Sequence, residues 1–379
     1  MKLTTLLGAT ALSITPMFGM IANAESHGMP DCENCSDSMV LMSWGGAYQA
    51  SQLAAYAEPY AAATGVTITW DEGANEGIAK MRAASEAGNM TYDLVDVEGP
   101  DGQRACDEGL AVEIDFDTVL APGTDGSTPT ADFGPSLIND CFIPQIVFST
   151  TFGYRNDVAA WNGAVPDSMC AIFDTTTFPG MRALESRPKK NLEWALLCDG
   201  VAQADLYTTL SSEGGVERAL AKLDTIKDSV VWWSAGAETP QLLADNEVVM
   251  GSTYNGRLFS VIEEQKVPVS MLWDWQVFDF DGWVVPTGLD EARMNRVMHF
   301  LNFATDTQRL ADQAKYISYG PARASSQPLV GMHATLGIDM AQHMPTNPAN
   351  QTNFLVNNIE WWADNSDEVD AKFQAWLAQ

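Results

Sequence analysis

The stretch from residue 277 to residue 286, Val-Phe-Asp-Phe-Asp-Gly-Trp-Val-Val-Pro, sets two carboxylates among three aromatic rings. Asp279 and Asp281 supply negative charge, and the faces of the neighbouring rings attract an ammonium group through their quadrupole, by about 0.5 to 2 kcal/mol per contact. These residues together predict a site for an organic cation. The alternative is an exposed edge strand on which rings and acids simply alternate.

Signatures of the common catalytic sites are absent from the sequence. It contains no GxSxG elbow, no HExxH, no GxGxxG after a predicted strand and no GxxxxGK[ST] loop. Ser186-Arg187-Pro188-Lys189 matches SxxK in letters only, because its proline breaks the helical turn that would place serine beside lysine. We therefore expect a binding protein without a cofactor, and a secreted hydrolase on an α/β scaffold is the competing hypothesis.

The charge of the chain excludes one class of partner. Fifty acidic residues against 20 basic ones give a formal net charge of −30, and such a surface repels nucleic acid. The acidity attracts cations at long range, but adaptation to a salty medium explains it equally well. It therefore supports a cationic ligand only weakly.

The N-terminus has the three parts of a secretory signal peptide. Lys2 is the positive region, Leu6 to Ile21 is the apolar region, and Ala22-Asn23-Ala24 is a small-residue cleavage site. The apolar region is shorter than the ~20 residues that span a bilayer. We predict a cleaved signal peptide at residues 1–24, a periplasmic mature protein, and a flexible leader at residues 25–38.

Six cysteines in an exported protein predict disulfides, for which fifteen pairings are open. Order along the chain favours Cys106 with Cys141 and Cys170 with Cys198, each closing a loop worth ~3 kcal/mol of stability. Cys32 and Cys35 then remain. A metal held by this CxxC pair with His27 is the alternative, but a lone CxxC is a poor zinc signal, so we expect a local disulfide and no metal.

Strand and helix patterns alternate at the start of the mature chain. The predicted strands are 39–44, 66–70 and 92–97, with helices at 48–63 and 78–87 between them. This order predicts a parallel sheet. Ligands of such sheets bind beyond the carboxyl ends of the strands, which places Trp44 and Glu98 at a candidate site.

A second α/β pattern follows an apolar run at residues 143–154 that is expected to carry the chain between two lobes. The predicted elements are helices at 191–198, 215–222, 241–245 and 293–304, strands at 230–233 and 248–254, and a helical cover at 353–377. At about 150 residues per domain, the chain is long enough for two lobes and a cleft between them.

Several segments resemble the periplasmic solute-binding proteins of ABC importers, specifically the spermidine/putrescine type. The segments are Ser43-Trp44-Gly45-Gly46, Cys106-Asp107-Glu108-Gly109-Leu110, residues 178–184 leading to 191–197, Tyr254-Asn255-Gly256-Arg257, Asp281-Gly282-Trp283-Val284-Val285-Pro286 and Tyr319-Gly320-Pro321. The resemblance covers most of residues 39 to 325. Each segment is weak by itself, and their order makes the match specific.

The resemblance implies a two-lobed periplasmic binding protein fold of type II, in which each lobe is a mainly parallel sheet flanked by helices. Lobe 1 is expected at residues 39–149 and 279–325, and lobe 2 at residues 150–278 and 326–379. A monomer of this kind grips a polyamine between its lobes and delivers it to a membrane permease. The resemblance places Trp44, Glu193, Tyr254, Asp281 and Tyr319 in the cleft.

Two residues depart from the polyamine pattern. Asp279 stands where polyamine binders are similar in having a ring, and Arg257 brings a positive charge that a diamine does not favour. Arg257 could pair with Asp279 or Asp281, or bind a carboxylate of the ligand. The last option predicts a zwitterionic solute, such as an amino acid or an opine-like compound, as the alternative to a polyamine.

Overall fold

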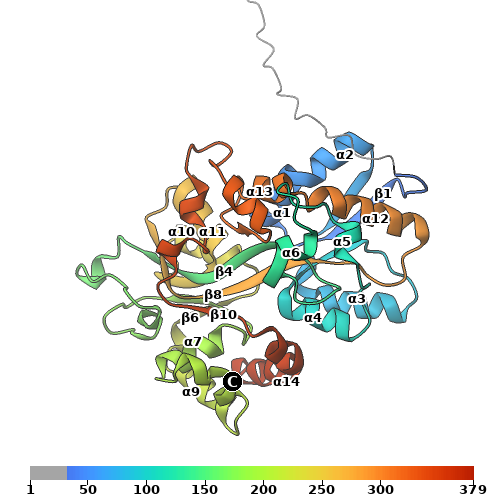
Figure 1. Cartoon of the computed structure of the whole chain (residues 1–379). Coiled ribbons are helices and arrows are strands. Elements are labelled where there is room, and N and C mark those ends of the chain that lie inside the picture. Colours follow the sequence, from blue (N-terminus) through green and yellow to red (C-terminus); the bar gives the residue numbers. More distant parts are fainter. Residues whose placement is uncertain (1–31) are drawn as a thin grey trace, which may run out of the picture. The chain divides into compact units, whose positions relative to one another are not determined.

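A ten-stranded sheet runs through residues 32–379, which are the residues that the structure, a computed structural model, describes (Figure 1). The strand order is β2-β1-β3-β8-β4-β7-β5-β6, with β10 paired to β8 and β9 paired to β4. Three parallel strands lie at each end of this order, and a long antiparallel pair joins them. The predicted signal peptide lies outside the described residues.

The first three strands form the parallel unit that the sequence predicts. The strands are β1 (Ser38–Met42), β2 (Thr67–Asp71) and β3 (Leu94–Glu98), and the helices are α1 (Gly46–Gln52), α2 (Glu58–Thr64), α3 (Gly77–Glu86) and α4 (Gly99–Asp107). A π-helical turn joins α1 to α2, and Gly65, with φ of 75°, ends α2. Because the three strands are parallel, their carboxyl ends meet at one edge of the sheet.

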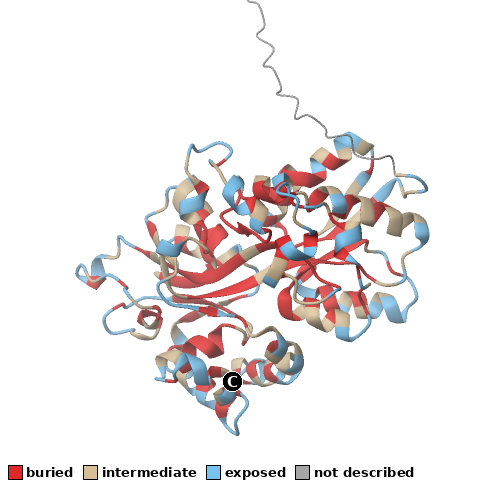
Figure 2. Cartoon of the chain, viewed as in Figure 1, coloured by how far each residue is buried: buried red, intermediate tan, exposed pale blue. Residues whose placement is uncertain are grey.

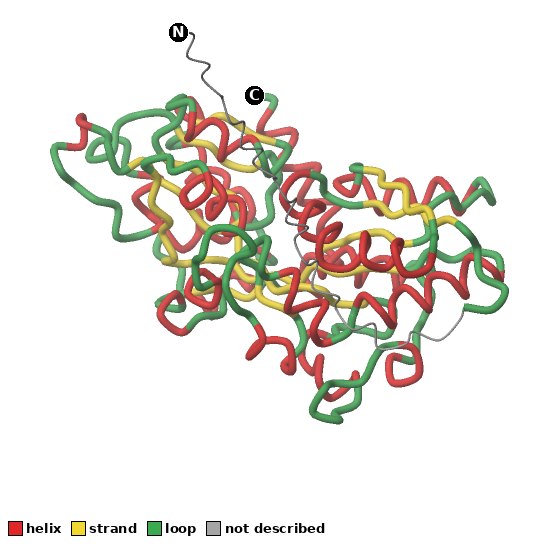
Figure 3. The backbone as a smooth tube through the Cα atoms, turned by 90° about the horizontal axis from the view of Figure 1, so that it is seen from above, coloured by secondary structure: helices red, strands yellow, loops and turns green. Residues whose placement is uncertain are grey.

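A second parallel unit follows at the other end of the sheet. Its elements are β5 (Arg182–Glu185), β6 (Val230–Trp233), β7 (Met250–Tyr254), α7 (Asn191–Cys198), α8 (Leu206–Leu210), α9 (Gly215–Asp224) and α10 (Glu238–Ala244). The sequence pattern did not predict β5, because its four residues include Arg182 and Glu185 and show no apolar run. Helices enclose the strands of both units (Figure 3).

Two long strands connect these units. They are β4 (Ile143–Arg155) and β8 (Val269–Val284), which pair with each other over most of their length. The lobe boundaries predicted at residues 149/150 and 278/279 fall within these two strands. At Gly282 the strands approach so closely that an added Cβ would lie 2.3 Å from the carbonyl oxygen of Ile143.

The remaining elements cover the sheet and its edges. They are α5 (Phe116–Val119), α6 (Pro129–Phe133), α11 (Asn255–Phe259), α12 (Glu291–Ala304), α13 (Thr307–Gln313), α14 (Ile359–Leu377), β9 (Gly320–Pro321) and β10 (Phe354–Val356). The tail that was predicted to be helical from residue 353 therefore begins with a strand. No helix among residues 32–379 has the length and apolarity needed to cross a membrane.

Each parallel unit has its own apolar core, and the buried residues follow the strands (Figure 2). One core contains Met42 and Val95 from the first unit. The other contains Trp194, Leu220 and Phe373, from α7, α9 and α14. Separate cores are what two lobes that move relative to each other require.

The three predicted disulfides are present: Cys32–Cys35, Cys106–Cys141 and Cys170–Cys198. The metal alternative for Cys32 and Cys35 is therefore wrong, and His27 lies outside the described residues.

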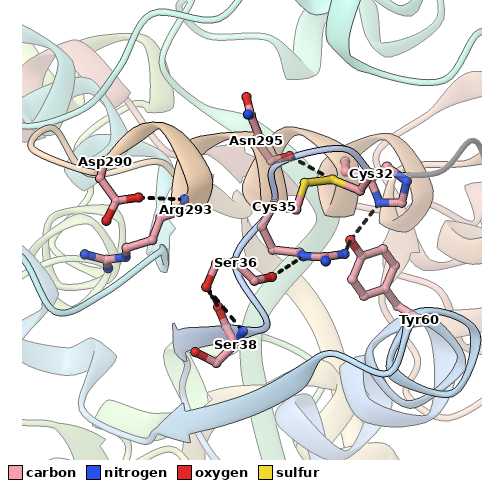
Figure 4. Close-up of a disulfide and its surroundings, with 10 residues drawn as sticks. Cys32, Cys35, Ser36, Ser38, Tyr60, Asp290, Arg293 and Asn295 are labelled. Carbon is pink, nitrogen blue, oxygen red and sulfur yellow. Dashed lines mark hydrogen bonds between the residues drawn. A yellow bond between two sulfur atoms is a disulfide. The ribbon is translucent and has the colours of Figure 1, made fainter.

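The end of the segment that was predicted to be a flexible leader is anchored to α12 (Figure 4). The Ser36 N–H donates to the Ala292 carbonyl at 2.9 Å, and Arg296 Nε donates to the Ser36 carbonyl at 2.7 Å. The same guanidinium donates to the hydroxyl of Tyr60 at 3.1 Å. Residues 32–38 are therefore part of the folded unit.

Candidate functional site

A cavity of about 270 Å³ opens where the carboxyl ends of β1, β2, β3 and β7 meet the last residues of β8, close to its own carboxyl end. We call it the strand-end cavity. Six of the eight predicted site residues line it: Trp44, Glu98, Tyr254, Arg257, Asp281 and Tyr319. The topology explains this convergence, since Trp44 follows β1, Glu98 ends β3, Tyr254 ends β7 and Asp281 lies opposite Glu98 in the β3–β8 register.

Asp281 is held by two side-chain donors. Trp44 Nε1 donates to Asp281 Oδ2 at 2.7 Å, and the Tyr48 hydroxyl donates to Asp281 Oδ1 at 2.6 Å. Both donors come from the first strand, turn and helix, where Gly45 and Gly46 take φ values of 64° and 57°. Positive φ is easy for glycine, and the turn brings the indole and the phenol to the same carboxylate.

The environment of Asp281 favours its neutral form when no ligand is bound. Burial raises its pKa well above the usual range, and the charge of Asp96 raises it further. The hydrogen bonds from Tyr48 and Trp44 oppose this shift. A ligand ammonium would add a positive charge beside the carboxylate and stabilise the ionised form.

Arg257 presents a buried cation to the same cavity. Its side chain is only 8% exposed, and α11 begins directly after β7, so the guanidinium lies 5.8 Å from the ring centroid of Tyr254. An added Cβ on Gly46 would lie 3.1 Å from Arg257 Nη1, and one on Gly236 would lie 2.9 Å from Nε. The absence of side chains at Gly46 and Gly236 therefore leaves room for the guanidinium on both sides.

The guanidinium of Arg257 has no carboxylate partner among residues 32–379. No ion pair within 4.0 Å involves it, and its buried Nε has no hydrogen-bond partner in that part of the chain. A pair of Arg257 with Asp279 or Asp281 was one possibility from the sequence, and the structure contains neither pair. A buried charge without a partner is costly, so this position is suited to an anionic group from a ligand.

Glu98 differs from Asp281 because two lysine side chains of the protein already balance its negative charge. Lys189 Nζ donates to Glu98 Oε2, and Lys190 Nζ donates to Glu98 Oε1 at 3.3 Å. Burial alone would raise the pKa of Glu98, but the two lysines lower it below its usual range. Glu98 is therefore an ionised member of an internal ion cluster.

Aromatic rings form the apolar wall of the cavity. Tyr319 precedes β9, and its ring centroid lies 6.0 Å from those of Tyr48 and Phe148. The Phe148 ring meets that of Tyr254 edge to face at 5.5 Å. These rings can pack against a short methylene chain between two charged ends.

Two predicted site residues lie elsewhere. Asp279 does not line the cavity, and its carboxylate accepts a hydrogen bond from Asn357 Nδ2. Burial raises the pKa of Asp279 to about 6, and the charge of Glu98 contributes to this shift. Glu193 is fully buried in the first turn of α7, where it accepts from the backbone N–H of Lys190 and the indole of Trp362 at 2.8 and 2.7 Å. Glu193 therefore does not line the strand-end cavity, because its carboxylate caps a helix.

Sequence reasoning missed several residues of the cavity. They are Gly45, Gly46, Tyr48, Glu72, Asn75, Ile146, Phe148, Ala235, Gly236 and Ala237. Glu72 follows β2, so the strand-end rule that selected Trp44 and Glu98 also reaches it. Tyr48 and Phe148 had no such signal, since both sit on apolar faces of a helix and a strand. Residues 32–379 contain no group of three or more His, Cys, Asp or Glu side chains placed to hold a metal ion.

The comparison with known families agrees with this fold. The family described as "Bacterial extracellular solute-binding protein" matches residues 55–346. The chain is also 33% identical over 344 residues to the gamma-aminobutyric acid-binding protein of Pseudomonas aeruginosa, with 91% of this chain and 92% of that protein covered.

Solved structures are similar over the same length. The structure described as the Atu4243-GABA receptor has 32% sequence identity to this chain and a TM-score of 0.75, and the match covers 90% of this chain and 98% of that one. AgtB of A. tumefaciens R10, solved with agropinic acid, shares 31% identity and a TM-score of 0.75, covering 90% and 99%. A spermidine/putrescine-binding protein of Streptococcus pneumoniae shares 16% identity and a TM-score of 0.64, which shows a common fold alone.

The chain is therefore a two-domain α/β binding protein and not an enzyme. It belongs to the family of bacterial extracellular solute-binding proteins, as the resemblance in its sequence indicated. The predicted fold class is confirmed. The predicted polyamine type within this family is not confirmed. The three relatives above, which share more than 30% identity with this chain, are named for GABA or solved with agropinic acid.

Proposed function

We propose that this protein is the periplasmic solute-binding component of an ABC importer, and that its solute is a small zwitterion carrying one ammonium and one carboxylate group. An ω-amino acid such as GABA, or an opine-like amino acid, has this chemistry. The observation that carries the proposal is the buried guanidinium of Arg257, which has no carboxylate partner among residues 32–379 and lies in the same cavity as Asp281.

The carboxylate end of the solute is assigned to Arg257. A guanidinium offers two parallel N–H groups to a carboxylate, and the pair is strongest where water is excluded. The relatives named for GABA and agropinic acid bind solutes that carry a carboxylate. A polyamine, our expectation from the motifs, carries only positive charge and would be repelled by Arg257.

The ammonium end is assigned to Asp281 and the rings around it. Trp44 and Tyr48 occupy one lone pair on each oxygen of Asp281, and the remaining lone pairs can accept from an ammonium group. Tyr254 and Tyr319 would enclose the methylene chain between the two ends. The cavity volume of about 270 Å³ is near the low end of small-molecule sites, ~300 to 1,000 Å³, as a short solute requires.

Capture by lobe closure completes the proposal. We assign residues 39–149 and 279–325 to lobe 1 and residues 150–278 and 326–379 to lobe 2, with the crossings in β4 and β8. Asp281, Trp44 and Glu98 then belong to lobe 1, and Arg257 and Tyr254 to lobe 2. A zwitterion held at both ends would join the two lobes, and the closed monomer would be presented to a membrane permease.

Isothermal titration calorimetry of the mature protein tests the proposal. We expect GABA or a related amino acid of one to three more carbons to bind, and putrescine and spermidine to bind much more weakly. Arg257→Met should weaken binding by about 2–5 kcal/mol, because it removes one partner of a buried ion pair. Arg218→Met is the matched control, since Arg218 pairs with Asp199 at the surface and its side chain is 48% exposed.

Two results would contradict the proposal. One is binding of polyamines with no binding of any zwitterion in the panel. The other is an Arg257→Met variant that keeps the dissociation constant of the parent protein.

A further inference from the structure

Two lysines that precede α7 reach across to Glu98, which lines the strand-end cavity. Lys189 and Lys190 follow β5 of the second parallel unit, whereas Glu98 ends β3 of the first. Both oxygens of Glu98 accept from a lysine, Oε2 from Lys189 and Oε1 from Lys190. Glu98 lines the cavity but has no negative charge left to offer a ligand cation.

Lys190 occupies a position that suits an ammonium ligand. Its Nζ lies 5.5 Å from the ring centroid of Phe148 and 5.5 Å from that of Tyr254, and both rings line the cavity. A carboxylate flanked by ring faces is the arrangement by which proteins bind organic ammonium groups. Here a side chain of the protein supplies the cation.

The backbone of Lys190 is strained, and its charge is almost completely buried. Its φ is 75°, which costs energy in a residue with a Cβ, and its side chain is 2% exposed. Glycine would adopt this φ freely, and a helix that begins at residue 191 does not need a lysine there. Strain and a buried charge at one position point to a role in the site beyond folding.

We propose that Lys190, with Lys189 beside it, is a specificity-determining residue that fills the place of a second ligand ammonium and so excludes diamines from the site. The inference rests on the proposed function, in which Asp281 takes the one ammonium of a zwitterion. A diamine would bring its second ammonium next to Glu98, where two lysine ammonium groups already repel it. A zwitterion of the same length brings a carboxylate for Arg257 and meets no such repulsion.

GABA and putrescine form a matched pair of probes. Both have four carbons in line with one terminal amine, and they differ in whether the other end is a carboxylate or a second amine. The ratio of their dissociation constants therefore measures the selectivity of the site with chain length held constant.

The variant that tests the inference is the double substitution Lys189→Met and Lys190→Gly. Methionine keeps an unbranched apolar side chain at residue 189, and glycine suits the φ of 75° at residue 190. Removing both lysines frees Glu98, and we expect the dissociation constant for putrescine to fall about tenfold or more, with a smaller change for GABA. Adding Glu98→Gln to the double variant should abolish this gain.

Lys266→Gly is the matched control. Lys266 also has a positive φ, 57°, but its side chain is 65% exposed and pairs with Glu263 at the surface. This substitution relieves the same kind of backbone strain without changing the cavity, so selectivity should stay as in the parent protein.

The outcomes separate this inference from the proposed function. A folded double variant, shown by an unchanged near-UV circular dichroism spectrum, that gains no affinity for putrescine overturns the role of the lysines, even where the parent protein binds GABA. If the double variant does not fold, Lys189→Met alone should show a smaller gain in the same direction, and no gain overturns the inference. If the parent protein binds no zwitterion, the proposed function fails, while the putrescine titrations still decide whether the lysines repel a second ammonium.

Discussion

At the scale of single residues, the site is defined by how each buried charge is balanced. Glu98 is neutralised inside the protein by Lys189 and Lys190, whereas Arg257 has no carboxylate partner within residues 32–379. Asp281 has two donors and no cation within 4.0 Å in that part of the chain. Arg257 carries a positive charge, and Asp281 would carry a negative one once an ammonium group lies beside it, which suits a solute that carries both signs.

Replacing Asp281 with asparagine should weaken binding of the ammonium group. The substitution keeps the size of the side chain but removes its negative charge, and we expect a loss of about 2–5 kcal/mol in binding free energy. Titration calorimetry with the solute that binds the parent protein measures it. An unchanged dissociation constant would show that Asp281 only holds Trp44 and Tyr48 in place.

Asp96 should make stability depend on pH. Burial raises its pKa from 3.8 to about 7, although hydrogen bonds from the side-chain amides of Gln52 and Gln145 oppose the shift. Between these two pH values the folded state holds more protons than the unfolded state, so stability from this group falls as pH rises from about 4 to about 7.

The test of Asp96 is urea unfolding of the parent protein and of Asp96→Asn at several pH values. Asparagine does not ionise, so the unfolding free energy of the variant should improve relative to the parent as pH rises through this range. A difference that stays constant with pH would mean that Asp96 does not titrate there.

At the scale of elements, the antiparallel pair β4 and β8 positions the site. These two strands are the connection through which the sheet continues from one parallel unit to the other, and β8 carries Asp281 to the register position opposite Glu98. Next to Asp281, Gly282 packs against the backbone at Ile143 and against the Phe142 ring. The position of the carboxylate therefore depends on this close contact.

Gly282→Ala should destabilise the protein by about 1–3 kcal/mol, because the new methyl group would overlap backbone atoms that cannot move aside easily. The expected readout is a lower midpoint of urea unfolding. Gly331→Ala serves as the control, since a Cβ there would meet its nearest atom at 3.9 Å and its φ is not positive. Equal midpoints for both variants would contradict the packing argument.

At the scale of the whole molecule, the architecture separates stability from binding. Each parallel unit has its own apolar core, while the strand-end cavity draws its residues from both units. A solute that binds only the folded, closed form therefore stabilises the protein by mass action.

We expect a solute concentration of one hundred times the dissociation constant to raise the unfolding free energy by about 2.7 kcal/mol. Differential scanning calorimetry with and without the solute measures the corresponding rise in melting temperature. An amine without a carboxylate should leave the melting temperature unchanged. A rise with every amine tested would indicate non-specific binding to a chain with a net charge of −30.

The sequence by itself predicted most of the helices and strands, the three disulfides, the family and six of the sixteen residues that line the cavity. Trp44 and Glu98 could be predicted because residues at the carboxyl ends of parallel strands must meet at one edge of the sheet, whatever the packing around them. Tyr254 was predicted from the family resemblance. Asp281 could be predicted because its carboxylate lies among aromatic residues in a recognisable motif.

Only the tertiary structure decided how the charges pair. Glu193 has the same chemistry as Glu98, but one caps α7 and the other reaches the cavity, since the first turn of a helix and the end of a strand direct a carboxylate differently. The lack of a carboxylate partner for Arg257 within residues 32–379 and the approach of Lys190 to Glu98 depend on how segments about 90 to 210 residues apart pack together. Local sequence patterns carry no information about such contacts, because they arise only when the two units pack together.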